Sequence, residues 1–109
     1  MSDMAAFSLE GKTAVLIGGA GAIGSAVAAG LGKVGATLVI ADVTQEKVDA
    51  AASDLAANGL CASGEVVDAL DRASIEKLRD RVCAAHGTVD ILVNLAGGNL
   101  AEASTSDER

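Results

Sequence analysis

The sequence predicts an α/β fold in which a parallel sheet carries helices on both faces. Short, wholly apolar segments such as residues 38–41 alternate with longer segments whose apolar residues recur at helical spacing. Apolar strands of this kind are typical of parallel sheets, because helices cover both of their faces. Half of the 109 residues are hydrophobic but Phe7 is the one aromatic residue, so the core is expected to consist of small and branched aliphatic side chains.

Four strands and three helices are predicted in alternation. The strands are expected at residues 13–17, 38–41, 60–67 and 89–93. The helices are expected at residues 22–34, at 45–58 after a Thr44 cap, and from either Asp71 or Ser74 to 86. Glycines at 35, 59 and 87 are expected to end them. The first helix is expected to bury one stripe, formed by Ile23, Val27, Leu31 and Val34.

This alternation indicates right-handed crossovers and the strand order 3-2-1-4, with the first two helices on one face and the third on the other. The prediction is a partial, Rossmann-like doubly wound domain over residues 9–100. A flexible leader (1–8) is expected before it, and a polar tail or truncated loop (101–109) after it. In such sheets ligands bind at the carboxyl edge, beside the strand where the order reverses.

Charge and composition exclude several classes of partner. The net charge of −7 argues against nucleic acid and against anionic membranes. No apolar stretch approaches the roughly 20 residues of a membrane helix, and the first residues lack the basic start of a signal peptide. Cys61 and Cys83 are expected to be buried thiols in a reducing compartment, so we expect a cytoplasmic protein.

Residues 15–27 combine an apolar strand, a glycine cluster and the start of an alanine-rich helix. Gly19, Gly21 and Gly24 satisfy G-x-G-x-x-G, which lets the backbone approach a pyrophosphate at a helix N-terminus. Asp42 follows the second strand, where a carboxylate can bind both adenosine ribose hydroxyls and would repel a 2′-phosphate. No Lys or Arg lies in the glycine bend or directly after Asp42, so NAD is expected and NADP is less favoured.

When the motifs further along the chain are added to the glycine bend and Asp42, the sequence resembles the first half of a short-chain dehydrogenase/reductase (SDR). Gly18-x-x-x-Ala22-x-Gly24 matches the family's T-G-x-x-x-G-x-G, and Asp42 its acid after the second strand. Val67-Asp68-Ala69 matches its D-V pair, and Asn94-Leu95-Ala96-Gly97 its N-N-A-G. Order and spacing agree over residues 9–98. Ile17, Ala22 and Leu95 depart from the family's residues without removing the cofactor edge.

The resemblance implies a set of cofactor-binding residues. The pyrophosphate would lie against Gly18, Gly21, Ala22, Ile23 and Gly24. The adenosine ribose would contact Asp42 and Val43, the adenine Asp68 and Ala69, and the nicotinamide-side ribose Asn94, Ala96 and Gly97. The stretch Ala96-Gly97-Gly98-Asn99 is similar to members that act on sugar acids or polyols.

Catalysis in this family resembles a Ser-Tyr-x-x-x-Lys arrangement, which would lie beyond Gly97. The chain contains no tyrosine, so no catalytic residue is assigned and the 109 residues alone are expected to be inactive. No metal site is indicated. The resemblance implies that the complete enzyme transfers hydride between NAD(H) and a small alcohol or carbonyl substrate. It is expected to form homo-oligomers or to bind a complementing chain.

Three other classes of protein are alternatives to this hypothesis. The main alternative is a non-catalytic NAD-binding or regulatory module. An S-adenosylmethionine methyltransferase fits less well, because Ile17 stands where an acidic residue usually opens the glycine loop. A P-loop NTPase is excluded, since no Gly-Lys-Ser/Thr follows the glycines.

Overall fold

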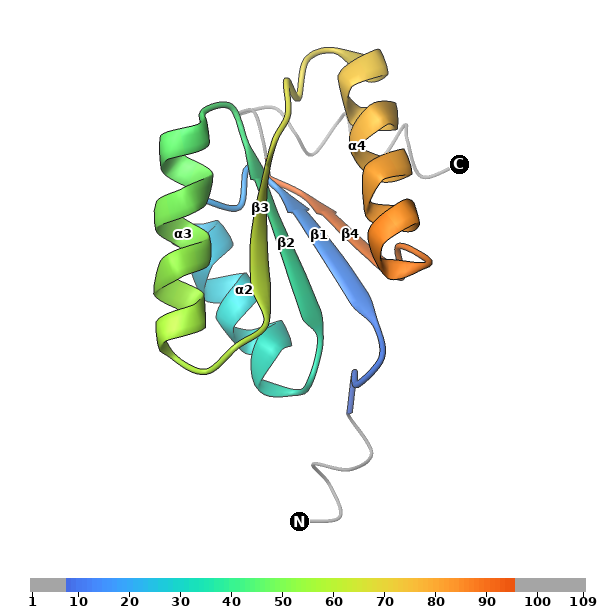
Figure 1. The fold of residues 1–109 in the computed structure, drawn as a ribbon. Coiled ribbons are helices and arrows are strands. Elements are labelled where there is room, and N and C mark those ends of the chain that lie inside the picture. Colours follow the sequence, from blue (N-terminus) through green and yellow to red (C-terminus); the bar gives the residue numbers. More distant parts are fainter. Residues whose placement is uncertain (1–7, 96–109) are drawn as a thin grey trace.

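The computed structural model describes residues 8–95, so the tail predicted at 101–109 and nearly all of the leader predicted at 1–8 lie outside the described residues. The predicted alternation of strands and helices is confirmed over this range (Figure 1). The elements are β1 (Thr13–Ile17), α2 (Ala22–Lys33), β2 (Thr37–Asp42), α3 (Gln45–Ala57), β3 (Ala62–Val66), α4 (Arg72–His86) and β4 (Ile91–Asn94).

The strands form one parallel sheet in the order β3-β2-β1-β4, as the sequence predicts. Ile17, the last residue of β1, pairs with Ala41 of β2 and Asn94 of β4. Asp42, the last residue of β2, pairs with Val66 of β3. The four strands therefore end at one edge of the sheet, where the segments that follow them meet.

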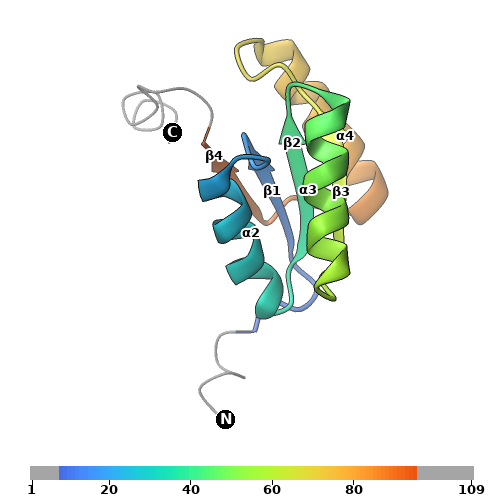
Figure 2. The same cartoon turned by 90° about the vertical axis from the view of Figure 1, so that its left-hand side faces the viewer.

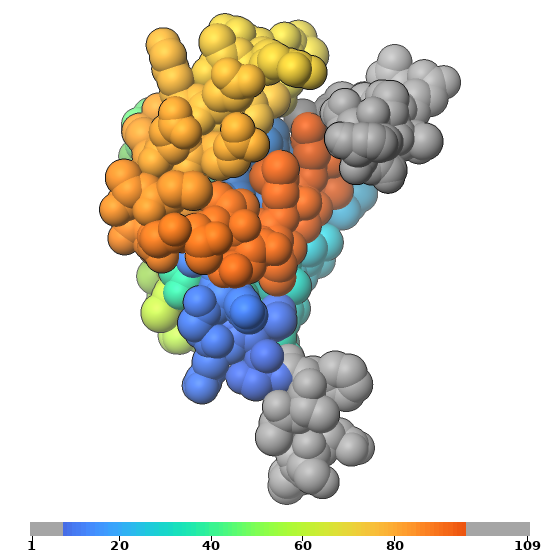
Figure 3. Space-filling view, turned by 90° about the vertical axis from the view of Figure 1, so that its right-hand side faces the viewer, coloured from blue at the N-terminus to red at the C-terminus, as the bar shows by residue number. Residues whose placement is uncertain are grey.

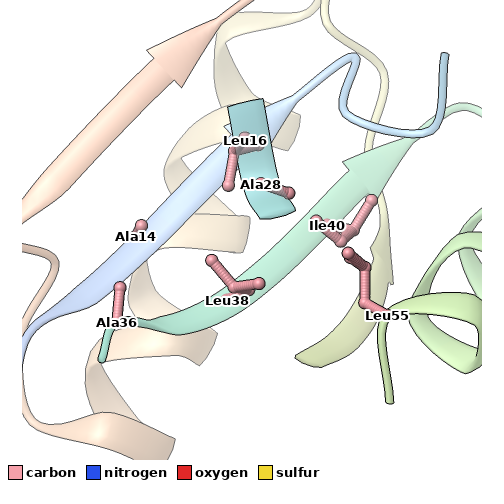
Figure 4. Packing of buried hydrophobic residues seen from close by; sticks show 7 residues of the cluster. All are labelled: Ala14, Leu16, Ala28, Ala36, Leu38, Ile40 and Leu55. Atoms are coloured by element: carbon pink, nitrogen blue, oxygen red, sulfur yellow. The ribbon is translucent and has the colours of Figure 1, made fainter. Parts of the chain in front are cut away.

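Helices cover both faces of this sheet. Figures 1 and 2 show α2 and α3 on one face and α4 on the other. Side chains of β1 and β2 alternate between the two faces, so both strands contribute to two apolar clusters. The cluster beneath α2 and α3 contains Ala14, Leu16, Ala28, Ala36, Leu38, Ile40 and Leu55 (Figure 4). The cluster beneath α4 contains Val15, Ile17, Val39, Ala41, Val67, Leu78 and Val82.

Side-chain caps fix where α3 and α4 begin. The Lys47 N–H donates to Thr44 Oγ1 over 3.3 Å, as expected for the cap of α3. The Ala73 N–H donates to Asp71 Oδ1 over 3.0 Å, so Asp71 rather than Ser74 caps α4. Ser74 lies in the first turn of α4, where its hydroxyl oxygen accepts a different backbone N–H, that of Asp68.

The predicted bounds of three strands are wrong by one or two residues. β2 is one residue longer at each end than the predicted 38–41, so Asp42 is its last residue and does not follow it. β3 begins at Ala62 rather than at residue 60, because the Leu60 N–H donates to the Leu55 carbonyl and completes the end of α3. β4 begins at Ile91 rather than at residue 89. The preceding Asp90 instead accepts the Thr13 N–H on its Oδ2, over 2.9 Å, which fixes the start of β1.

Two predictions about burial are also wrong. Ile23 is 72% exposed, because it lies in the first turn of α2 at the edge where the strands end; Gly24 and Ala28 are buried instead. The thiols of Cys61 and Cys83 are exposed rather than buried. Cys61 precedes the edge strand β3, and Cys83 lies on the outer side of α4. Among the described residues, no helix is long and apolar enough to cross a membrane.

Candidate functional site

The glycine bend between β1 and α2 is bound to the end of β2. The N–H groups of Gly18 and Gly19 both donate to the Ala41 carbonyl, over 2.8 and 3.2 Å. Gly18 has a φ of 81°, in the left-handed region that favours glycine. A Cβ on Gly24 would lie 2.5 Å from the Gly19 Cα, so glycine at position 24 lets α2 approach the bend closely. The bend is therefore held in place from two sides.

The Asp42 carboxylate is hydrogen-bonded to this bend. Its Oδ2 accepts the Ala20 N–H over 3.2 Å, and its Oδ1 accepts the Val43 N–H over 2.8 Å. The side chain is half-buried. Each carboxylate oxygen has one further lone pair for a ligand. The structure thus brings together the glycine bend and the acid that the sequence singles out.

A solvent-open groove of about 440 Å³ runs between the bend and α3. It is lined by Gly18, Ala20, Gly21, Ser25, Asp42, Lys47, Ala50 and Ala51. Gly21 is the N-cap of α2 and has a φ of −81°, a value that any residue can adopt. A Cβ on Gly21 would meet no atom within 4 Å, which shows that this position faces open space.

The first turn of α2 offers backbone donors to this edge. Ala22, Ile23 and Gly24 are the first three residues of the helix, whose N–H groups have no partner within it. The N-cap Gly21 has no side chain to accept them, and no acidic residue lies in the first turn. This helix end therefore has unopposed positive partial charge, which suits an anion.

A second groove lies beside the ends of β2 and β3. Its lining residues are Val43, Val66, Val67, Asp68 and Ser74. Val43 and Val66 are 54% and 40% exposed and give the groove apolar walls. The Asp68 N–H donates to Ser74 Oγ over 2.9 Å, and Asp68 Oδ1 accepts the Leu70 N–H over 3.0 Å, so the loop at its rim is ordered by its own hydrogen bonds.

The remaining predicted site residues are placed differently. Ala69 packs against the apolar cluster beneath α4 and does not line the second groove. Asn94 ends β4 beside Ile17, at the same edge of the sheet as the bend. Ala96 and Gly97 lie outside the described residues.

Several groove-lining residues are absent from the sequence-based set. Ala20 could have been predicted from the sequence as a site residue, because it lies inside the glycine motif. Ser74 was singled out only as a possible helix cap. Lys47 gave no signal, since a lysine in an amphipathic helix is ordinarily solvated. Within residues 8–95, no three His, Cys, Asp or Glu side chains gather into a set that could hold a metal ion.

The parallel order 3-2-1-4, with a glycine bend and an acid at its carboxyl edge, defines a Rossmann-like α/β domain. Comparison with known proteins specifies the family. The model of the short chain dehydrogenase family matches residues 12–109. The chain belongs to this family of oxidoreductases.

Individual relatives agree with this assignment. The oxidoreductase UxuB of Bacillus subtilis (strain 168) is 40% identical over 101 residues, which cover 93% of this chain and 36% of that protein. The structure of 2-keto-3-deoxy-D-gluconate dehydrogenase from Streptococcus agalactiae is 40% identical, with a TM-score of 0.79, and the match covers 84% of this chain and 35% of the other.

A third match was solved with NAD bound. This protein from Haemophilus influenza is described as a D-mannonate oxidoreductase. It is 29% identical, with a TM-score of 0.78 over 88% of this chain and 34% of its own. The chain thus spans about a third of the length of each of these three relatives.

Proposed function

We propose that this chain is the NAD-binding part of an SDR oxidoreductase. The observation that carries the proposal is the hydrogen bond from the Ala20 N–H to Asp42 Oδ2. It joins a bend suited to a pyrophosphate and a carboxylate suited to a ribose at one groove. The related structure with bound NAD supports a nicotinamide cofactor.

In this proposal each part of the cofactor edge has its own residues. The N–H groups of Ala22, Ile23 and Gly24, with Gly18 and Gly21 beside them, would hold the pyrophosphate. The remaining lone pairs of Asp42 would accept the two ribose hydroxyls, and a single negative charge there favours NAD over NADP.

The second groove would hold the adenine. The exposed faces of Val43 and Val66 would contact its ring, with Asp68 at the rim and Ala69 supporting the loop from below. Asn94, Ala96 and Gly97 remain our proposed contacts for the nicotinamide-side ribose.

The reaction that we propose for the complete enzyme is hydride transfer between the nicotinamide and a small alcohol or carbonyl substrate. When NAD is bound, its nicotinamide ring would supply the group that accepts the hydride. The chain has no tyrosine, so we assign the Tyr and Lys of the family's catalytic arrangement to protein outside these 109 residues and propose that the chain alone is inactive. The names of two relatives, a 2-keto-3-deoxy-D-gluconate dehydrogenase and a D-mannonate oxidoreductase, suggest a sugar acid as substrate, and that of a third, a D-threitol dehydrogenase, suggests a polyol, so we keep both classes.

We also propose that further protein covers the flank of the sheet beside β4, either a second copy or a complementing segment. Among the described strands, β4 has a neighbour on one side only. An apolar cavity beside it is lined by Val15, Ile17, Ile75, Leu78, Arg79, Val89 and Leu92, and Leu92 is 56% exposed. In Figure 3, β4 (orange-red) lies at the surface beside α4 (yellow-orange). We place the protein in the cytoplasm, where its exposed thiols would stay reduced.

Calorimetric titration of the intact protein with NAD, NADH and AMP tests the proposal. All three are expected to bind. Asp42→Asn should weaken each of them about tenfold, because all three carry the adenosine ribose. Asp54→Asn, which removes an exposed carboxylate of α3 that does not line the groove, is the matched control and should change none.

Two results would contradict the proposal. A folded protein that binds none of the three ligands would overturn cofactor binding. Tight NAD binding without turnover of any sugar acid, polyol or other small alcohol by the complete protein, which includes the part outside these 109 residues, would favour the non-catalytic module instead.

A further inference from the structure

We propose that Asn58 is a site of spontaneous deamidation, at which the chain gains a negative charge without any enzyme. Asparagine is among the thermolabile residues of proteins. Asn58 is the C-cap of α3 and is followed by Gly59, which has no side chain to hinder attack by its own backbone nitrogen. The other two asparagines of the sequence, Asn94 and Asn99, each precede a leucine. Asn58 is therefore the asparagine most open to this chemistry.

The reaction uses only the groups at this position and water. The Gly59 nitrogen bonds to the side-chain carbonyl carbon of Asn58, and the amide nitrogen leaves as ammonia with the proton of the Gly59 N–H. The product is a cyclic succinimide that includes the former backbone nitrogen. Water then adds to one of its two carbonyl carbons and breaks the bond from that carbon to nitrogen. One opening gives aspartate, and the other gives isoaspartate, in which the chain runs through the side chain of residue 58.

This end of α3 is accessible to water and to base. Asn58 and Gly59 are both exposed, and a Cβ on Gly59 would meet no atom within 4 Å. Gly59 has a φ of 84°, in the left-handed region that favours glycine. The backbone that ends α3 thus requires a glycine directly after an exposed asparagine, which is the arrangement that favours deamidation.

Hydrogen bonds of the helix end oppose the reaction in the folded protein. Asn58 Nδ2 donates to the Asp54 carbonyl over 3.0 Å, and the Gly59 N–H donates to the Ala56 carbonyl over 2.9 Å. Asn58 has a ψ of 14°, so its Cα–C bond must rotate before the Gly59 nitrogen faces the side-chain carbonyl carbon. Ring closure therefore requires the end of α3 to open locally, and the rate of deamidation reports how often it opens.

The product destabilises the helix end that the amide caps. Aspartate at position 58 has no Nδ2 donor for the Asp54 carbonyl. Its negative charge lies at the C-terminus of α3, where the helix dipole opposes it, and no basic residue lies in the last turn to offset it. Deamidation therefore promotes the local opening on which it depends.

Tryptic peptides separate Asn58 from the other two asparagines. One peptide spans residues 48–72 and contains Asn58 alone, and another spans residues 82–109 and contains both of the others. The protein is incubated at mildly alkaline pH, either folded or in urea, and isoaspartate is then located by peptide mapping. In urea it should form at residue 58 while the second peptide stays largely unchanged. In the folded protein it should form at least about tenfold more slowly, because only the locally opened minority reacts.

Three variants complete the test. Asn58→Gln lengthens the side chain by one methylene, which disfavours ring closure, so isoaspartate should be lost from the 48–72 peptide. Asn58→Asp reproduces one product and should lower the urea midpoint of unfolding. Asn58→Ser is the matched control for charge, because it removes the amide without adding a carboxylate, and it should lower the midpoint less.

The outcomes test each part of the inference. If Asn58 stays intact in urea, or reacts no faster than the asparagines of the 82–109 peptide, the site is overturned. Isoaspartate that persists in the Asn58→Gln peptide would come from an aspartate and would overturn it as well. Equal rates in the folded and unfolded protein would show that the hydrogen bonds at the end of α3 do not protect the amide. An unchanged midpoint for Asn58→Asp would contradict the destabilising effect of the product.

Discussion

At the scale of single residues, Gly21 and Gly24 belong to the same glycine motif but have different environments. Gly24 is buried, and a Cβ there would lie 2.5 Å from the Gly19 Cα. Gly21, three positions earlier, faces open space and has a φ that any residue can adopt. Glycine at position 24 is therefore required by packing, and glycine at position 21 is not required by the fold.

This difference predicts unequal effects of two alanine substitutions on stability. Gly24→Ala should lower the free energy of unfolding by about 1–3 kcal/mol, because α2 must move away from the bend. Gly21→Ala, the matched control, should change it by less than about 0.5 kcal/mol. Urea denaturation followed by circular dichroism measures both. Equal losses for the two variants would show that the close approach of α2 to the bend is not the cause.

The residues of the site were predictable only where a motif fixes them. The glycine spacing and the acid after the second strand placed Gly18 and Asp42 at one edge of the sheet, because parallel strands share their carboxyl ends. Lys47 and Ser74 could not be predicted as groove-lining residues, because the sequence does not show which helix lies beside which groove. Ile23 was assigned to the buried stripe because apolar periodicity does not show that a helix starts beyond the end of the sheet.

At the scale of elements, α4 is attached to the sheet in two ways. Its Leu78 and Val82 are buried against the sheet. Its Arg81 donates to Glu65 Oε1 over 3.0 Å and to the Val66 carbonyl over 3.4 Å, across the edge strand β3. Both side chains of the ion pair are partly exposed, so solvent screens it. Apolar packing is therefore expected to dominate the attachment.

A pair of substitutions measures the two contributions. Leu78→Ala should destabilise the protein by about 2–5 kcal/mol, because it leaves a cavity in the cluster beneath α4. Arg81→Ala should cost less than about 1 kcal/mol, and its effect should shrink in high salt. Denaturation midpoints at low and high ionic strength provide the measurement. A larger loss from Arg81→Ala than from Leu78→Ala would contradict this ranking.

Element types were predicted correctly over the described residues, including the third strand, in which Gly64 interrupts the apolar pattern. A Cβ on Gly64 would lie 3.0 Å from the Val48 Cβ, so the residue that weakens the pattern is the one that admits α3. Strand ends were less predictable, because contacts such as that of Asp90 with Thr13 link residues far apart in sequence.

At the scale of the whole molecule, the strand order followed from the alternation of strands and helices, because crossover handedness leaves few alternatives. The alternation did not show, however, which side chains of the outermost strand β4 are buried. Leu92 on β4 is 56% exposed, although it belongs to an apolar run that suggested a covered strand.

The exposed flank yields a prediction about association. If a second copy covers it, Leu92→Glu should shift the intact protein toward the monomer in size-exclusion chromatography. Leu70→Glu is the matched control, because Leu70 is 95% exposed in the loop before α4 and does not line the apolar cavity; it should leave the elution volume unchanged. Hydrogen exchange should show lower protection of β4 in the Leu92 variant. A wild-type protein that elutes as a well-protected monomer would exclude self-association.

The first groove is built from consecutive elements. Its lining begins at Gly18 and ends at Ala51, so the bend after β1, the start of α2, the end of β2 and the first half of α3 supply all of it. The bond between Ala20 and Asp42 lies within this continuous segment. The α3 wall of the groove, however, packs against β3, where Gly64 lets Val48 approach closely. The groove is therefore expected to take its final shape only after β3 has joined the sheet, although none of its lining residues comes from that strand.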